Sequence, residues 1–146
     1  MIKKLDHIGI AVRDINQSLK KWESVFAIKA SGTEEVTERG VKVAYLNIPG
    51  GSAVELIEPL EEGTPVDRFL KQQGEGIHHI CLEVEDIDEA IRELKNKGIE
   101  FVSEKPAKGA GGSRIVFLRP QNINGVLIEI KETCSSKLES NTEFKG

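Results

Sequence analysis

Hydrophobic and polar residues alternate over residues 5–12, near the start of the chain. Ile8, Ile10 and Val12 occupy one set of alternate positions, and His7 falls in the other set. Successive side chains of a strand point to opposite faces, so this spacing predicts a strand whose histidine lies opposite its aliphatic residues.

A helical pattern follows this strand. Asp14 can cap the helix, with Gln17 at the third helical position. Apolar residues then recur at helical spacing, at Ile15, Leu19, Trp22 and Phe26. Three further strands are predicted after the helix, with a turn at Arg39-Gly40, over residues 34–38, 41–48 and 53–58.

The same order is repeated 72 residues later, where His78–Ile87 echoes Asp6–Ile15 with His, Ile, Val, Asp and Ile in register. Asp86 is placed to cap the second helix, and strands are predicted over residues 100–103, 114–118 and 126–132. The fold class is therefore α+β, built from two tandem β-α-β-β-β modules. We expect a first module over residues 1–60, a linker with a short helix over 61–76, a second module over 77–132 and a polar tail over 133–146.

Four polar residues recur at matching places in the two halves. His7 and His79 are 72 residues apart in the first strands, and Glu55 and Glu129 are 74 apart in the last strands. A lone strand histidine is more often structural than a ligand, but a solvent-exposed face has no reason to repeat both residue types at nearly one offset. Two imidazoles and two carboxylates suit a divalent transition metal and leave about two positions open. His78 falls outside this register, so we expect a structural or outer-shell role for it.

The composition narrows the class of protein. The chain has 146 residues, 30% of them charged, and a net charge of -4, which gives no sign of a nucleic-acid-binding surface. No apolar run approaches the roughly 20 residues of a membrane span, and the N-terminus lacks a signal-peptide core. Cys81 lies in a strand pattern and is expected to be a buried thiol. We therefore expect a cytoplasmic protein with no nucleic-acid or membrane partner.

The chain resembles the methylmalonyl-CoA epimerases of the glyoxalase / vicinal oxygen chelate superfamily over about residues 4–132. The resemblance is carried by DHIGIAV at 6–12, VELIEP at 54–59, GEGIHHIC at 74–81, GAGG at 109–112 and GVLIE at 125–129. It implies a mixed sheet curved around a metal site, commonly in a homodimer. It also implies a divalent ion (Co, Zn, Ni or Mn) held by His7, Glu55, His79 and Glu129. Some epimerases have Gln at the position of Glu55.

The resemblance also implies a reaction, the epimerisation of (2R)/(2S)-methylmalonyl-CoA by a 1,1-proton transfer through a metal-stabilised enolate. Two carboxyl groups on opposite sides of the α-carbon would move the proton, and the resemblance places them at Glu38 and Glu129. Coenzyme A carries phosphates, so an acidic protein needs a local basic patch. The candidates flank the glycine-rich segment and are Lys105, Lys108 and Arg114.

Two other functions use the same scaffold. One is glyoxalase I (lactoylglutathione lyase) or another metal-dependent enzyme of the superfamily, such as a dioxygenase. The other is a non-catalytic protein that sequesters a small molecule. The GEGIHHI and GAGG segments favour the epimerase over the lyase, and retention of all four ligand residues counts against the sequestering protein.

Overall fold

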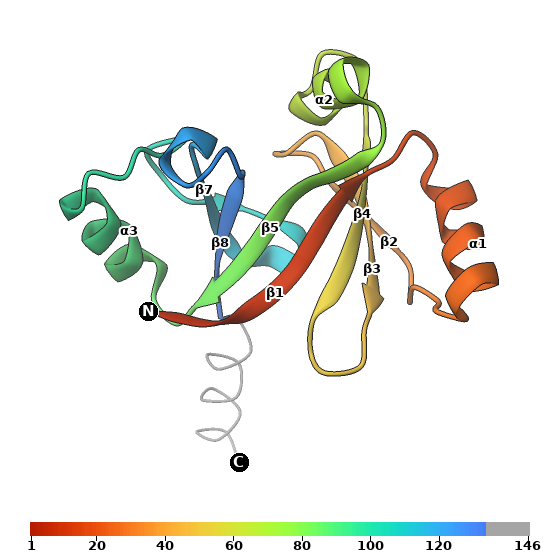
Figure 1. The fold of residues 1–146 in the computed structure, drawn as a ribbon, viewed down its shortest axis with the longest axis horizontal. Helices are drawn as coiled ribbons and strands as arrows, with labels where there is room; N and C mark the ends of the chain where they lie inside the picture. The colour runs from red at the N-terminus through yellow and green to blue at the C-terminus, as the bar shows by residue number, and fades with distance from the viewer. Residues whose placement is uncertain (134–146) are drawn as a thin grey trace. The chain divides into compact units, whose positions relative to one another are not determined.

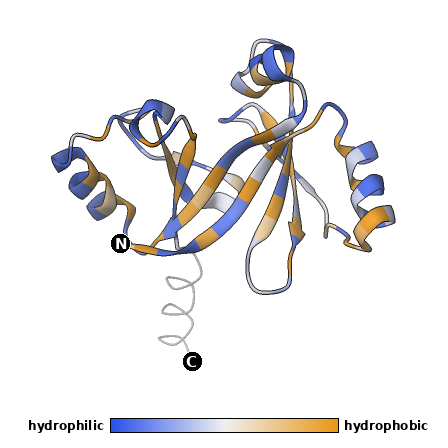
Figure 2. Ribbon diagram, viewed as in Figure 1, coloured by the Kyte–Doolittle hydropathy of each residue, from blue (hydrophilic) through white to orange (hydrophobic). Residues whose placement is uncertain are grey.

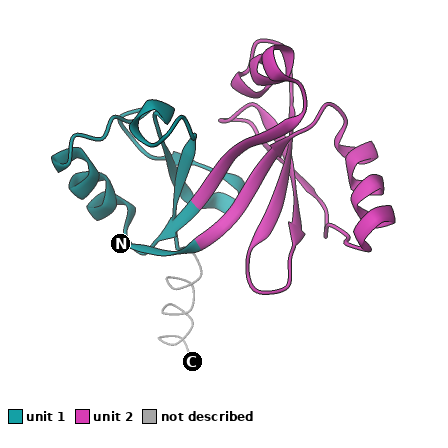
Figure 3. Cartoon of the chain, in the orientation of Figure 1, with its two compact units in different colours: residues 1–4, 82–146 teal, residues 5–81 magenta. Residues whose placement is uncertain are grey.

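The structure is a computed structural model that describes residues 1–133. Most of the predicted tail over 133–146, with Cys134, therefore lies outside the described residues. The chain divides into two compact units (Figure 3), which are described in turn. Unit 1 comprises residues 1–4 and 82–146, and unit 2 comprises residues 5–81.

Unit 2 contains most of β1, five complete elements after it and the start of β5, as can be followed by the labels in Figure 1. Its elements are β1 (Ile2–Ala11, from Leu5), α1 (Ile15–Phe26), β2 (Thr33–Val36), β3 (Val41–Asn47), β4 (Ala53–Pro59), α2 (Pro65–Gln73) and the first part of β5 (Gly76–Val84). The strand order is β2-β3-β4-β1-β5. β1 pairs with β4 in parallel, and β3 pairs with β2 and β4 in antiparallel fashion.

Helix α1 covers the aliphatic side of β1 and of its neighbours. The Asp14 carboxylate accepts a hydrogen bond from the backbone N–H of Gln17 at 3.0 Å, as the capping pattern predicted. The buried residues of this core are Val12, Ile15, Ala44, Leu46 and Leu56. Leu19 and Trp22 pack against it, whereas Phe26, the last residue of the predicted apolar stripe, is 60% exposed. Phe26 is the last residue of the helix and packs on Trp22 instead.

Unit 1 contains the last part of β5 and the second helix-and-strands set. Its elements are α3 (Ile87–Asn96), β6 (Ala107–Lys108), a 3-10 turn (Ala110–Gly112), β7 (Arg114–Leu118), a second 3-10 turn (Pro120–Asn122) and β8 (Ile128–Glu132). In the sheet order β5 is followed by β8, β7 and β6. Asp86 caps α3 by accepting from the N–H of Glu89 at 3.1 Å, and Ile87, Ala90 and Ile91 form its buried face.

The strand predicted over residues 100–103 is wrong. Only a single bridge, Phe101 with Leu118, forms there, and the short strand β6 lies a few residues later. The Asn122 side chain accepts from the N–H of Glu100 at 3.1 Å and donates to its carbonyl at 2.7 Å. Backbone bonds to the region of β7 also form, from the N–H of Val102 to the carbonyl of Phe117 at 2.8 Å and from the N–H of Arg119 to the carbonyl of Glu100 at 3.0 Å, but the pairing is limited to the one bridge.

The α+β class and the doubled β-α-β-β-β order are confirmed. Figure 2 shows hydrophobic and hydrophilic residues alternating along β1 and β5, as the patterning predicted. Cys81 is buried, as expected. The division at 60, 76 and 132 stays a prediction. Within the described part of the chain, no helix combines the length and apolar character needed to cross a membrane.

Candidate metal centre

Three of the four predicted ligand residues converge within unit 2. His7 comes from β1, Glu55 from β4 and His79 from β5. The Nε2 atoms of the two imidazoles lie 3.2 Å apart. Glu55 Oε1 lies 3.4 Å from Nε2 of His7 and 3.3 Å from Nε2 of His79. One carboxylate oxygen and two imidazole nitrogens therefore face a common point.

Gly9 makes this convergence sterically possible. A Cβ at Gly9 would lie 2.5 Å from Nδ1 and 2.6 Å from Nε2 of His79, far inside van der Waals contact. The same residue is opposite Glu55 in the β1–β4 register. Only a residue without a side chain lets the His79 ring lie against β1 beside Glu55. The sequence contained Gly9 in its DHIGIAV motif, but the alternation pattern assigned it no role.

The polar face of the strands is buried. His7 and His79 are each 1% exposed, and Glu55 is 0% exposed. Neither carboxylate oxygen of Glu55 makes a hydrogen bond of ordinary geometry with the described residues. A buried carboxylate that lacks such bonds is costly unless a cation compensates it. The donor set of two imidazoles and a carboxylate therefore fits a divalent metal ion.

The charge state of Glu55 is set by its neighbours. Burial by itself would raise the pKa of its carboxyl, but the two imidazoles and the Arg39 guanidinium outweigh burial and hold that pKa well below its ordinary value. Glu55 is therefore an anion at neutral pH and available as a ligand. Arg39 Nη1 lies 3.7 Å from Glu55 Oε2, and its side chain is only 9% exposed. Sequence reasoning placed Arg39 in a turn and missed this contact.

Each imidazole is held by a partner on its other nitrogen. Nδ1 of His7 lies 2.8 Å from Asp6 Oδ2, and the Nδ1 atoms of His78 and His79 lie 3.0 Å apart. Metal-binding histidines are commonly oriented in this way, with the far nitrogen bonded to a carboxylate or another polar group. Tyr45 packs edge-on against His7 at 5.4 Å between ring centroids. These contacts aim the Nε2 atoms at the shared point and agree with the outer-shell role expected for His78.

The two predicted proton-transfer residues lie in different settings. Glu129 is on β8 of unit 1, opposite Phe117 in the β7–β8 register, and is 2% exposed. Glu38 is exposed and lies in the turn between β2 and β3 of unit 2, since β2 ends at Val36 and not at residue 38 as predicted. Glu129 matches Glu55 in the sequence repeat, and its role as a ligand and acid/base group stays a prediction.

The predicted basic patch lies in unit 1. Lys105 and Lys108 are exposed, the first in a loop and the second in β6. The Arg114 guanidinium makes two hydrogen bonds to the carboxylate of Asp88, at 2.9 and 3.0 Å. Arg114 is therefore held by a carboxylate, and its charge is partly compensated there.

A second pair of glutamates binds the N-termini of helices α1 and α3. Sequence reasoning missed this role. Glu58 on β4 accepts from the N–H of Ile15 at 2.9 Å, and Glu132 on β8 accepts from the N–H of Ile87 at 3.1 Å. Each carboxylate satisfies an N-terminal amide of its helix, where the helix dipole favours negative charge. The spacing Glu-x-x-Glu in both last strands was the available signal.

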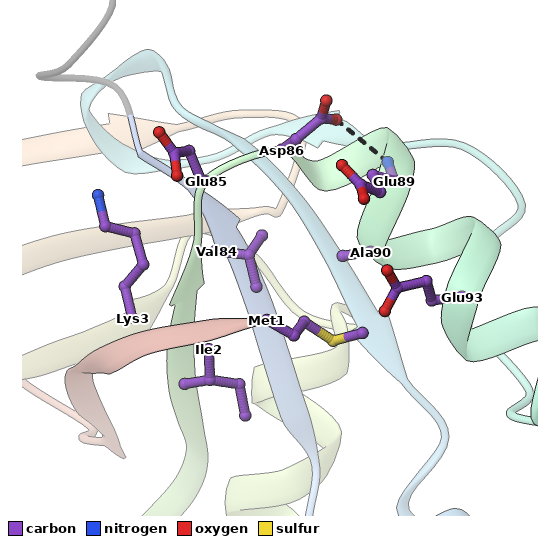
Figure 4. Close-up of a pocket in the computed structure, with 9 residues that line it drawn as sticks. All are labelled: Met1, Ile2, Lys3, Val84, Glu85, Asp86, Glu89, Ala90 and Glu93. Atoms are coloured by element: carbon purple, nitrogen blue, oxygen red, sulfur yellow. Dashed lines mark hydrogen bonds between the residues drawn. The ribbon is translucent and has the colours of Figure 1, made fainter.

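One cavity of unit 1 lies elsewhere. It has a volume of about 590 Å³, and Figure 4 shows Met1 and Ile2 together with the carboxylates of α3 and of the two residues that precede it. Its lining residues are Met1, Ile2, Lys3, Val84, Glu85, Asp86, Glu89, Ala90 and Glu93. None of the predicted site residues is among them.

Comparisons of the sequence with known proteins agree on one family. The model of the Glyoxalase/Bleomycin resistance protein/Dioxygenase superfamily matches residues 6–117. An ethylmalonyl-CoA/methylmalonyl-CoA epimerase of Cereibacter sphaeroides is 37% identical over 134 residues, covering 90% of this chain and 99% of the relative. A mitochondrial methylmalonyl-CoA epimerase of Dictyostelium discoideum is 36% identical over 132 residues, covering 90% of this chain and 79% of the relative.

Solved structures agree with these relatives. A methylmalonyl-CoA epimerase in complex with methylmalonyl-CoA and NH4+ is 34% identical, has a TM-score of 0.87 and is matched over 92% of this chain and 96% of its own. Similarity to a lactoylglutathione lyase of Schizosaccharomyces pombe is lower, at 26% identity over 159 residues, and covers 52% of that protein. The family expected from the sequence motifs is therefore confirmed, and the lyase is the more distant relative.

Proposed function

Since the chain belongs to the methylmalonyl-CoA epimerase family of the Glyoxalase/Bleomycin resistance protein/Dioxygenase superfamily, we propose that it interconverts the (2R) and (2S) forms of methylmalonyl-CoA. The observation that carries the proposal is the buried cluster of His7, Glu55 and His79. An enzyme of this family needs a site that stabilises an oxyanion, and this cluster can hold the cation for it.

The chemical difficulty of the reaction is the acidity of the substrate. The C–H between a thioester and a carboxylate is a far weaker acid than any protonated side chain, so negative charge must be stabilised as the proton leaves. A divalent cation, when bound, supplies that stabilisation as a Lewis acid. In the proposal, His7, Glu55 and His79 hold the ion, and Glu129 completes the set as a fourth ligand.

Epimerisation requires two groups that exchange a proton with opposite faces of one carbon. We assign these roles to Glu38 and Glu129. One carboxylate removes the α-proton, and the other, already protonated, returns a proton to the opposite face. The exposed turn position of Glu38 is accessible to a substrate from solvent, which supports its assignment.

The remaining parts of the proposal concern ligands and assembly. Two imidazoles and two carboxylates suit borderline metals, so Co, Zn, Ni and Mn are the candidates. Lys105 and Lys108 are proposed to attract the phosphates of coenzyme A, with Arg114 limited by its pairing to Asp88. A homodimer and a cytoplasmic location complete the proposal.

The decisive experiment is an exchange assay in heavy water. The purified protein, loaded in turn with each candidate metal, should incorporate deuterium at the α-carbon of methylmalonyl-CoA. A parallel sample should leave the hemithioacetal of methylglyoxal and glutathione unchanged. Turnover of the hemithioacetal without deuterium in methylmalonyl-CoA would assign the lyase activity instead.

A ligand variant separates catalysis from sequestration. His79→Ala should lose both metal and exchange, because it removes one of two imidazoles from the cluster. Lys20→Gln, which removes one exposed charge from α1, is the matched control and should keep both. If His79→Ala still binds methylmalonyl-CoA as wild type does and wild type shows no exchange, the protein is a binding protein and the proposal fails.

A further inference from the structure

The two oxygens of the Glu55 carboxylate have different kinds of neighbour. Its Oε1 faces the imidazoles, at 3.4 Å from His7 Nε2 and 3.3 Å from His79 Nε2. Its Oε2 faces the other way, at 3.7 Å from Nη1 of Arg39. Each oxygen of the same group therefore has a different partner.

Arg39 is unusual for a turn residue because its charged side chain is largely withdrawn from water. The residue follows the exposed Glu38 and precedes Gly40, whose φ of 69° allows the chain to turn into β3. The Arg39 side chain is 9% exposed, although an exposed turn would let a long cation extend into solvent. Burying a guanidinium is costly unless it is paired, and the Glu55 carboxylate is buried beside it.

We infer that Arg39 is a positioning residue for Glu55: it binds Oε2 and thereby presents Oε1 alone to the two imidazoles. A monodentate carboxylate, which binds through one oxygen, occupies one coordination position. A bidentate carboxylate, which binds through both oxygens, would occupy two. The pairing thus keeps a position open for substrate oxygens. It also compensates the charge of the buried Glu55 carboxylate.

The inference rests on the proposed role of Glu55 as a ligand, but its first test uses neither metal nor turnover. Thermal unfolding of the metal-free protein is measured for wild type, Arg39→Gln, Glu55→Gln and the double variant. Each single variant removes one charge of a closely spaced, largely buried pair and should lower the melting temperature by about 5 °C or more. The double variant removes both charges, so its loss should be clearly smaller than the sum of the two single losses.

Two further variants serve as controls for this double-mutant cycle of Arg39 and Glu55. Lys20→Gln removes an exposed positive charge from the same unit and should leave the melting temperature unchanged. Arg39→Lys keeps the charge and covers the case in which Arg39→Gln fails to fold; it should retain most of the wild-type melting temperature. Additive losses in the double variant, or an Arg39→Lys loss as large as that of Arg39→Gln, would overturn the pairing.

The second test addresses the presentation of one oxygen. The visible absorption spectrum of Co²⁺ reports its coordination number and geometry, so Arg39→Gln should alter the spectrum of the Co²⁺-loaded protein while Lys20→Gln should not. An unaltered spectrum would show that Arg39 does not control how Glu55 binds. Absence of deuterium exchange with an intact stability cycle would instead count against the proposed function alone.

Discussion

The first strands of the two sequence copies place a histidine at the same position but support it differently. In β1 the Nδ1 of His7 is held by the carboxylate of Asp6 at 2.8 Å. In β5 the Nδ1 of His79 is held by the imidazole of His78 at 3.0 Å, and Phe69 packs edge-on against His78. A charged partner makes an imidazole more basic than a neutral one does, so we expect the two proposed ligands to be equivalent in position and unequal in strength.

The two copies also differ two residues farther along each strand. Gly9 stands in β1 where Cys81 stands in β5. The glycine is required because the His79 ring occupies the space of a side chain, whereas the Cys81 side chain is itself buried. The repeat therefore preserves the two histidines proposed as ligands and varies the residues around them, which shows where each copy has its own structural requirement.

The largest effects should come from removing the ligands themselves. We expect His7→Ala and His79→Ala each to weaken Co²⁺ binding by more than about 100-fold, beyond the usual losses for outer-shell partners. Titration calorimetry with Co²⁺ measures this, and exchange of the α-proton should be lost in parallel. Retention of wild-type affinity in either variant would remove that histidine from the ligand set.

The next largest effect compares Co²⁺ binding after substitution of Gly9 and of Cys81, which occupy matching positions in the two copies. Gly9→Ala should weaken Co²⁺ binding by about 100-fold, because the new methyl group displaces the His79 ring, a ligand that must be held closely in place. Cys81→Ala, at the matching position, should change binding little because it makes the side chain smaller. The same calorimetric titration compares them. Equal affinities for Gly9→Ala and wild type would contradict the steric role of Gly9.

A smaller effect separates the two outer-shell partners. Asp6→Asn keeps a hydrogen-bond acceptor but removes the charge, and we expect a loss of about 10- to 100-fold in Co²⁺ affinity. His78→Phe keeps a ring beside Phe69 but removes the nitrogen, and we expect about 10-fold or less, since a neutral partner polarises His79 weakly. A greater loss for His78→Phe than for Asp6→Asn would reverse the ranking of the two supports.

The smallest effect concerns the glutamates at the helix N-termini. Glu58→Gln and Glu132→Gln each keep an acceptor for the helix amide and lose the charge, which is worth about 0.3–2 kcal/mol. Melting temperatures should therefore fall by a few degrees. The loss should be larger for Glu132, which is 6% exposed and has Arg114 at 3.7 Å, than for the half-buried Glu58. As a control, both variants should bind Co²⁺ with the affinity of wild type, because the two glutamates lie outside the proposed ligand set.

Local patterns predicted most of the fold. The capping residues Asp14 and Asp86 and the alternation in β1 and β5 produced elements within a few residues of their observed bounds. The strand expected over residues 100–103 is reduced to a single bridge, Phe101 with Leu118, where the Asn122 side chain also binds the backbone of Glu100. The glutamates at the helix ends were overlooked because their partners are far away in the sequence.

The sequence by itself determined which residues share a face and which ones recur, because strand and helix periodicity act over a few residues. It thereby singled out His7, Glu55 and His79. Only the tertiary structure decided that this polar face is buried, that Gly9 yields its space to His79 and that Arg39 reaches Glu55. These outcomes depend on which strands become neighbours and how closely they approach, and such long-range contacts leave no mark on local patterning.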